Sequence, residues 1–282
     1  MKLRRLADAP ADLSSVDRLV MEAYNVPSRR RELEMYLAAQ PDGWFVLVDG
    51  SEIVSVGGGF RYGSFCWLGL VATKPTRQRQ GLATRISTHL VDWARRRGST
   101  TIALDASEAG RRVYEQLGFR VVGETTELSL PPVVADEKAP STVRCDTRNV
   151  EQLPALDRRI FGGDRAGLLR SLSRQADARC YFAVNGDEVV GYLFVRNRLV
   201  GPGVAWDADI ARGLLRAAII DRRRTSVSEE QRLLLPVESR YLDVASRLDF
   251  RIERRLAHMR LGDPVLPGKR RELLAQTSYA AG

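Results

Sequence analysis

Histidine and cysteine are scarce in this sequence of 282 residues, which contains two histidines and three cysteines. The cysteines, Cys66, Cys145 and Cys180, are widely spaced and form no C-x-x-C pattern. The composition therefore indicates neither a zinc cluster nor a cysteine–histidine nucleophile pair, and we expect no bound metal. Isolated thiols fit a reducing compartment, so we expect a cytoplasmic protein.

Long hydrophobic runs are also missing. No segment approaches the roughly 18 consecutive apolar residues of a membrane-spanning helix. Residues 1–8 lack the apolar stretch of a signal peptide, and we expect no membrane partner. Hydrophobic residues still make up 44% of the chain, which suffices for one large or two ordinary domains with cores of their own.

The formal charge is +9, and most of the basic residues are arginines. Either the arginines form a solvated surface, or they attract a polyanion or a phosphorylated ligand. Charge alone does not decide between the two. No basic strip with interleaved aromatic residues is visible, so we expect no specific nucleic-acid partner; such binding would have to be salt-sensitive.

A basic, glutamine-rich turn follows the apolar run at residues 65–72 and opens into a helical pattern. Apolar residues recur there at helical spacing: Leu82, Ile86, Leu90 and Trp93. A helix N-terminus offers unpaired backbone N–H groups and a partial positive charge, to which Arg77 and Arg79 add two full charges. The turn is a candidate phosphate site, although an ordinary exposed helix start would have the same pattern.

Two pairs of similar segments recur in the same order and at similar offsets. The hairpin turn Asp49-Gly50 matches Asn185-Gly186, and residues 116–119 (Gln-Leu-Gly-Phe) match residues 247–250 (Arg-Leu-Asp-Phe). Two ordered echoes indicate an internal duplication. Between the halves lies a polar, proline-containing stretch without periodicity. We therefore expect a first domain at 1–131, a linker at 132–141, a second domain at 142–264 and a tail at 265–282, which docks back on the fold or frays.

The second half lacks the basic turn. Its corresponding helix begins near Asp207 with no Arg/Gln-rich loop before it, and Asp207 and Asp209 occupy the first turn. Carboxylates suit the helix dipole there but repel a phosphate. We expect that the second half keeps the scaffold and has lost the anion site, which leaves one such site per chain.

Two segments of the first half together resemble the GNAT superfamily of acyl-CoA-dependent N-acyltransferases. Residues 75–83 (Pro-Thr-Arg-Gln-Arg-Gln-Gly-Leu-Ala) are similar to the family's central signature. Residues 107–119, with Tyr114 and the Leu-Gly-Phe exit, are similar to its small helix. The resemblance covers residues 1–130, and the second half is similar to the degenerate domain of tandem members. It implies an α/β (α+β) fold of two GNAT-like domains, each a mixed, mostly antiparallel sheet flanked by helices.

The resemblance also implies a binding site for an acyl-CoA, most simply acetyl-CoA. Gly81 would let the backbone approach the pyrophosphate, and the neighbouring N–H groups would cradle it. At the strand end, where the family separates two parallel strands, main-chain groups would bind the pantetheine arm. Ser107 would contribute at the next strand end, or simply cap a helix. The full set expected to contact the donor is Val71, Ala72, Thr73, Gln78, Arg79, Gln80, Gly81, Leu82, Ala83, Thr84, Ser107 and Gly110.

Tyr114 is the residue that the resemblance assigns to catalysis, as the general acid that protonates the departing CoA thiolate; core packing is the alternative. The general base is not identified, because residues 65–69 hold no carboxylate. Asp105 is a substitute acting through water, or else half of a structural salt bridge. Tyr24 and Trp67 would line the acceptor pocket or belong to the core, and Cys66 is expected to pack rather than react.

The hypothesis that follows is direct transfer of an acyl group to an amine, with a small molecule favoured over a protein as acceptor. The sequence leaves open the acceptor's identity, the acyl chain length and the oligomeric state. Because no base is evident, a non-catalytic acyl-CoA sensor is the alternative.

Overall fold

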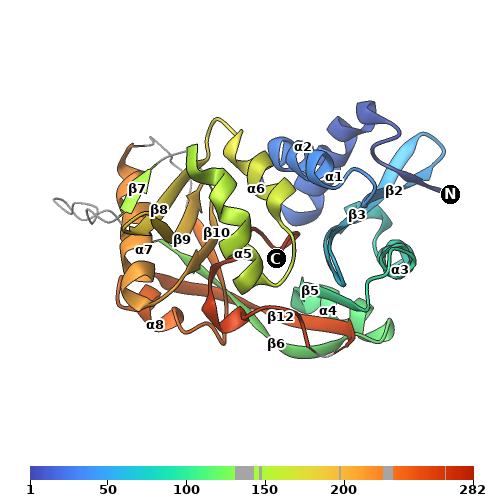
Figure 1. Ribbon diagram of the computed structural model, residues 1–282. Coiled ribbons are helices and arrows are strands. Elements are labelled where there is room, and N and C mark those ends of the chain that lie inside the picture. Colours follow the sequence, from blue (N-terminus) through green and yellow to red (C-terminus); the bar gives the residue numbers. More distant parts are fainter. Residues whose placement is uncertain (131–142, 146–147, 197, 225–230, 264) are drawn as a thin grey trace. The chain divides into compact units, whose positions relative to one another are not determined.

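The structure is a computed structural model that describes residues 1–130, 143–145, 148–196, 198–224, 231–263 and 265–282. It divides into two compact units (Figure 1). Unit 1 contains Met1–Val122, His258–Leu266 and Tyr279–Ala281, and unit 2 contains Gly123–Ala257, Pro267–Ser278 and Gly282.

Each unit is assembled from three separate segments of the sequence, whereas the expected domains 1–131 and 142–264 are each one continuous stretch. Two strands, β6 (Arg120–Ser129) and β12 (Arg251–Gly262), each begin in one unit and end in the other. Within unit 1 the end of β12 lies next to β5 (Thr101–Ala106), which would otherwise be an open sheet edge. The expected linker 132–141 falls outside the described residues.

Unit 1 is built on the strand order β1-β2-β3-β4-β5-β12. The neighbours from β1 to β4 are antiparallel, and β4 and β5 are parallel. Its further strands are β1 (Lys2–Arg5), β2 (Trp44–Asp49), β3 (Glu52–Tyr62) and β4 (Phe65–Thr73). Its helices are α1 (Leu13–Tyr24), α2 (Arg30–Ala39), α3 (Leu82–Arg96) and α4 (Glu108–Gln116), with short 3-10 turns at Pro10–Asp12 and Pro75–Arg77.

Helices cover both faces of the unit 1 sheet. On one face Trp44 stacks on Tyr36 of α2, with ring centroids 5.2 Å apart. On the other face Phe45 meets Trp93 of α3 edge-on at 6.3 Å. Alternation along β2 thus sends neighbouring aromatic rings to opposite sides. The expected hairpin is confirmed, with Gly50 at the β2–β3 turn in the left-handed region at φ +60°.

Unit 2 repeats the sequence of elements in unit 1, which confirms the duplication. Its strands are ordered β12-β6-β11-β10-β9-β8-β7, with β13 also on β10. They are β7 (Val143–Cys145), β8 (Arg179–Asn185), β9 (Glu188–Val195), β10 (Leu199–Ala205), β11 (Arg232–Pro236) and β13 (Leu273–Ala275). Its helices are α5 (Leu153–Phe161), α6 (Ala166–Ser173), α7 (Ala208–Arg224) and α8 (Leu242–Ser246), with 3-10 turns at Arg148–Gln152 and Arg270–Glu272.

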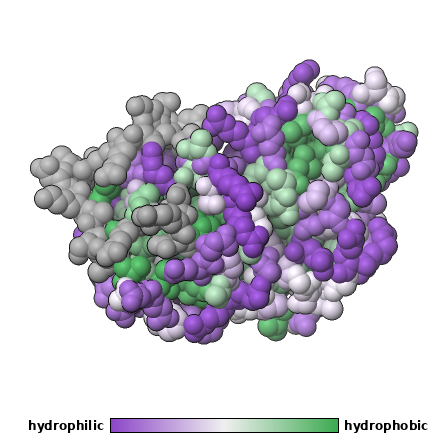
Figure 2. All heavy atoms as spheres, turned by 45° about the horizontal axis from the view of Figure 1, so that its top comes forward, coloured by the Kyte–Doolittle hydropathy of each residue, from purple (hydrophilic) through white to green (hydrophobic). Residues whose placement is uncertain are grey.

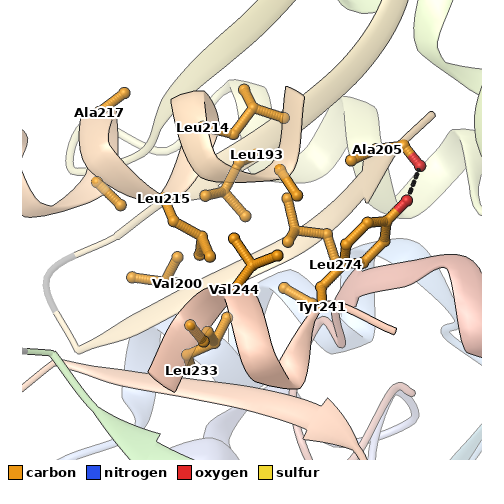
Figure 3. Packing of buried hydrophobic residues seen from close by; sticks show 14 of the residues in the cluster. Leu193, Val200, Ala205, Leu214, Leu215, Ala217, Leu233, Tyr241, Val244 and Leu274 are labelled. Atoms are coloured by element: carbon orange, nitrogen blue, oxygen red, sulfur yellow. Dashed lines mark hydrogen bonds between the residues drawn. The ribbon is translucent and has the colours of Figure 1, made fainter. Parts of the chain in front are cut away.

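The core of unit 2 lies between α7, α8 and the sheet (Figure 3). Leu214 and Leu215 of α7 pack with Leu274 of β13, and all three are fully buried. The Tyr241 hydroxyl donates to the Ala205 carbonyl at 2.5 Å, so this ring is held at both ends. The apolar residues of α7 therefore belong to the core of unit 2.

The charged residues are mostly spread over the surface. Figure 2 shows hydrophilic side chains over most of the coloured face, with apolar residues in smaller areas between them. Many arginines are held in ion pairs, such as Arg97 with Asp42 at 2.6 Å and Arg30 with Glu34 at 2.7 Å. This favours a solvated arginine-rich surface. None of the described helices combines the length and apolar character that a membrane crossing needs.

Candidate active site

A β-bulge interrupts β4 at Leu70. Val56 pairs with Ala72 and Gly58 pairs with Gly69, so Leu70 and Val71 together face the single residue Gly57. Leu70 takes a left-handed conformation, φ +54°, which is costly for a leucine. Such a bulge re-aims the backbone, and Leu70 directly precedes Val71, the first residue of the expected donor site.

The parallel strands β4 and β5 stop pairing just before this bulge. The β4–β5 ladder ends at the pair Trp67–Ala103, although β4 continues to Thr73 and β5 to Ala106. Gly69, Leu70 and Val71 are partly exposed, while Trp67 is buried. The interior sheet thus opens into a wedge between β4 and β5. Of the expected donor residues here, Ala72 and Thr73 pair with β3, and the Val71 carbonyl accepts a hydrogen bond from the Tyr24 hydroxyl at 2.7 Å.

The turn before α3 has the geometry of an open helix N-terminus. Gly81 is the N-cap at φ +74°, and no side chain of the described residues caps the helix there. A Cβ at Gly81 would meet no described heavy atom within 4 Å, so the space beside it is open. Gln78, Arg79, Gln80 and Gly81 are exposed, Ala83 and Thr84 are half-buried, and Leu82 is buried. The first-turn N–H groups therefore lie beside open space, as an anion site at a helix start requires.

Arg77 shapes this turn rather than presenting its charge. It bonds Asp49 at 2.7 Å and the Gln80 side chain at 3.2 Å. The guanidinium holds the pKa of Asp49 below its ordinary value. Arg79, by contrast, is exposed beside the helix start and adopts φ +61°.

Tyr114 of α4 is 9% exposed and lies on the α3 side of the sheet, against Phe119 at 5.7 Å. Burial raises its pKa to about 12, and the nearby Ser87 of α3 opposes this. The pKa of Tyr24 is also raised, by burial of the Tyr24 hydroxyl and by the nearby Tyr114, although Tyr24 as a whole is 45% exposed. The phenol of Tyr114 therefore stays protonated at neutral pH.

Ser107 is the N-cap of α4, because its Oγ accepts from the Gly110 N–H at 3.3 Å. A Cβ at Gly110 would lie 3.5 Å from both that Oγ and the Tyr114 ring. Both residues thus shape the start of the helix that carries Tyr114.

Comparisons with known proteins agree with this geometry. Residues 13–119 match the acetyltransferase (GNAT) family, and residues 153–275 match an acetyltransferase (GNAT) domain. The chain is 30% identical over 220 residues to the uncharacterized N-acetyltransferase YitH of Bacillus subtilis (strain 168), covering 73% of each chain. The chain belongs to the GNAT acetyltransferase family.

Solved structures extend the likeness to both units. A putative acetyltransferase from Pyrococcus horikoshii is 26% identical with a TM-score of 0.87, covering 100% of this chain and 95% of that one. A tandem GNAT protein from the clavulanic acid biosynthesis pathway, 16% identical, has a TM-score of 0.68 over 93% of this chain and 98% of its own, which shows the fold alone. The predicted tandem GNAT architecture and the enzyme class are thus confirmed, and enzymes of this family use acetyl-CoA.

This GNAT unit also contains a buried pair that sequence reasoning missed. Asp105 Oδ1 lies 3.0 Å from His258 Nδ1, and Arg260 donates to His258 Nε2 at 3.2 Å. Because Nε2 accepts, the ring proton is on Nδ1 and is donated to Asp105. Both side chains are at most 1% exposed. A ring protonated only on Nδ1 is neutral, so this contact is a buried hydrogen bond rather than a salt bridge, and it favours a structural role for Asp105.

Trp67 is buried beneath other parts of the chain rather than lining an open pocket. It stacks on His258 at 5.3 Å, and its Nε1 donates to the Tyr279 carbonyl at 3.1 Å. The tail therefore docks back, as one of the two expected arrangements. Cys66 is buried, which raises the pKa of its thiol and agrees with packing.

Proposed function

We propose that unit 1 binds acetyl-CoA and transfers its acetyl group directly to an amine, with a small molecule as acceptor. The observation that carries this proposal is the continuity of three features in one unit. The bulged wedge of β4 leads to the open N-terminus of α3, and the protonated Tyr114 lies beside α3.

The residues present fit a CoA pyrophosphate. N–H groups of residues 78–84 supply donors at a helix start, and Gly81 leaves room for close approach of the anion. Arg79 offers a guanidinium beside them. The strand segment Val71, Ala72 and Thr73 would align the pantetheine arm, and Ser107 and Gly110 would bound it at the start of α4.

In the transfer, the amine nitrogen attacks the thioester carbonyl carbon, the C–N bond forms and the C–S bond breaks. The Tyr114 hydroxyl donates to the sulfur as negative charge develops on it and supplies the proton of the CoA thiol. The Asp105 carboxylate is buried and hydrogen-bonded to His258, so the amine loses its extra proton to water, and the Tyr114 phenolate takes a proton back from solvent.

Calorimetric titration with acetyl-CoA tests the donor site. The wild type is expected to bind one equivalent, and Gly81→Glu is expected to weaken binding by at least about 100-fold, since like charges at close range cost several kcal/mol. Gly186→Glu is the matched control, because Gly186 is also at positive φ with no described atom within 4 Å of an added Cβ.

No binding by the wild type, or undiminished binding by Gly81→Glu, contradicts the proposed donor site. An equal loss in Gly186→Glu would show that the effect is one of folding rather than of charge.

A further inference from the structure

Residues Tyr279–Ala281, which we call the strap, are fixed to unit 1 through their backbone. Trp67 Nε1 donates to the Tyr279 carbonyl at 3.1 Å, and the Tyr62 hydroxyl donates to the Ala281 carbonyl at 2.8 Å. Ala280 and Ala281 are buried. Backbone contacts of this kind hold a segment in place whatever its own side chains are.

Gly69 shows how closely the strap approaches β4. A Cβ at Gly69 would lie 2.3 Å from the Cα of Ala280 and 2.8 Å from its Cβ. Gly69 is not at positive φ, so its backbone would accept an alanine and only the strap forbids one. The strap thus covers the strand at the residue immediately before the Leu70 bulge.

The strap and Tyr114 lie on opposite faces of the unit 1 sheet. Residues that pair across antiparallel strands point to the same face of the sheet. Gly69 pairs with Gly58, which pairs with Trp44, and Trp44 stacks on Tyr36 of α2. Trp67, two residues before Gly69 and paired with Phe60, therefore also points to the face that carries α2. Tyr114 lies with Ser87 on the α3 face. If the leaving sulfur is protonated from the α3 face, the amine approaches from the face that the strap covers.

We propose that the strap is the acceptor-specificity element of this acetyltransferase. It narrows the approach to the carbonyl carbon so that a primary amine on an unbranched chain reaches it, while a bulky amine and bulk water do not. The inference rests on the proposed donor site, and it adds a role for residues 279–281 that the donor site does not require.

Two substitutions loosen the strap to different degrees. Gly69→Ala forces it away from β4, and Tyr62→Phe removes one hydrogen bond while leaving the ring in place. Gly123→Ala is the matched control, because Gly123 also lies in a strand and an added Cβ would make only an ordinary 3.7 Å contact with Glu238. Hydrogen–deuterium exchange at residues 279–281 measures the displacement directly, and calorimetry measures acetyl-CoA affinity in each variant.

Two kinetic measurements then report on how the strap controls access to the carbonyl carbon. The first is hydrolysis of acetyl-CoA to acetate and CoA thiol, in which water attacks the carbonyl carbon and its proton ends on the sulfur. The second is the ratio of kcat/KM for cyclohexylamine to that for n-butylamine. In Gly69→Ala we expect hydrolysis to rise about tenfold, because water is no longer excluded. The amine ratio should also rise about tenfold. Tyr62→Phe should change both in the same direction by less, and Gly123→Ala should change neither.

The inference is overturned if hydrogen–deuterium exchange in the strap becomes faster while the hydrolysis rate and the amine ratio stay unchanged. It is also overturned if exchange in Gly69→Ala is as slow as in the wild type. If neither amine reacts, the hydrolysis rate decides; if Gly69→Ala fails to fold, Tyr62→Phe does. A wild-type protein that binds no acetyl-CoA refutes the donor site instead, and that result is read from calorimetry alone.

Discussion

Units 1 and 2 have the same wedge in their sheets but fill it differently. In unit 2 the parallel β10–β11 ladder ends after Leu199 and Val200, and a register shift follows in β10, as in β4. There, however, β13 pairs with β10, and the Gln276 N–H donates to Leu234 of β11 at 2.9 Å. The chain itself occupies the wedge in unit 2, whereas in unit 1 residues 69–71 stay partly exposed.

The long helices beside these wedges also begin differently. In unit 1 the N-cap is Gly81, which has no side chain to cap with. In unit 2 Asp207 Oδ1 accepts from the N–H groups of Asp209 and Ile210, both at 2.9 Å. A carboxylate thus satisfies two of the donors that an anion would need.

The short helices differ at the position of Tyr114. The N–H of Phe119 donates to the Tyr114 carbonyl at 3.0 Å, and that of Phe250 donates to the Ala245 carbonyl at 3.2 Å. Ala245 therefore stands where unit 1 has Tyr114. The two units therefore keep the same order of strands and helices although the wedge, the start of the long helix and the residue at the Tyr114 position all differ.

The largest expected effect sharpens the contrast at Tyr114. Tyr114→Phe should lower kcat by about 10²–10⁴-fold through loss of the general acid, with acetyl-CoA affinity unchanged. Tyr241→Phe in unit 2, which also removes one buried hydroxyl, should cost about 1 kcal/mol of stability and leave kcat unchanged. Steady-state kinetics beside calorimetry separate the two. If Tyr114→Phe keeps its turnover, the sulfur is protonated by another group or by solvent.

The next largest effect is expected when β13, which fills the wedge of unit 2, is weakened. Leu274→Ala removes a fully buried side chain of β13 (Figure 3) and should lower the free energy of unfolding by about 2–5 kcal/mol. Urea unfolding measures this, with Val265→Ala as the control because Val265 is 70% exposed. Acetyl-CoA should still bind in one equivalent. A second equivalent would mean that β13 alone blocks a donor site.

A smaller effect is expected at the start of α7. Asp207→Ala removes the acceptor for two backbone N–H groups and should cost about 1 kcal/mol. Asp209→Ala, in the same turn but bonded to Arg212 rather than to backbone, should cost less. Thermal unfolding of both variants ranks them, and an equal cost would count against the cap.

The smallest effect is the pH dependence of the Asp49–Arg77 pair beside the unit 1 turn. Because Arg77 lowers the pKa of Asp49, the pair stabilises the fold above the ordinary carboxyl value of about 3.8 and loses this as the pH falls through the lower folded value. The free energy of unfolding of Asp49→Asn, measured by urea unfolding, should therefore be lower than that of the wild type at about pH 6 and equal to it at about pH 2. A difference that persists in acid would show that the substitution acts by another route.

Local patterns in the sequence were enough to predict the elements that position the site. Turn residues at Gly50 and Gly186, helical spacing after Gly81 and the Leu117-Gly118-Phe119 exit each depend on near neighbours. The bulge at Leu70 had no such signal, since leucine rarely adopts a positive φ and the register of β3 against β4 imposes it. The division into units also could not be read from the chain, because β12 ends in unit 1 after passing through unit 2.

The family, the order of elements and the carboxylates at the start of the second long helix could all be predicted from the sequence, because each is written in segments a few residues long. Tertiary structure alone decided that β13 fills the second wedge, that His258 meets Asp105 from 153 positions away, and that Tyr279 covers Trp67 from 212 positions away. Contacts at such separations depend on how strands pair and pack, and no local periodicity encodes them.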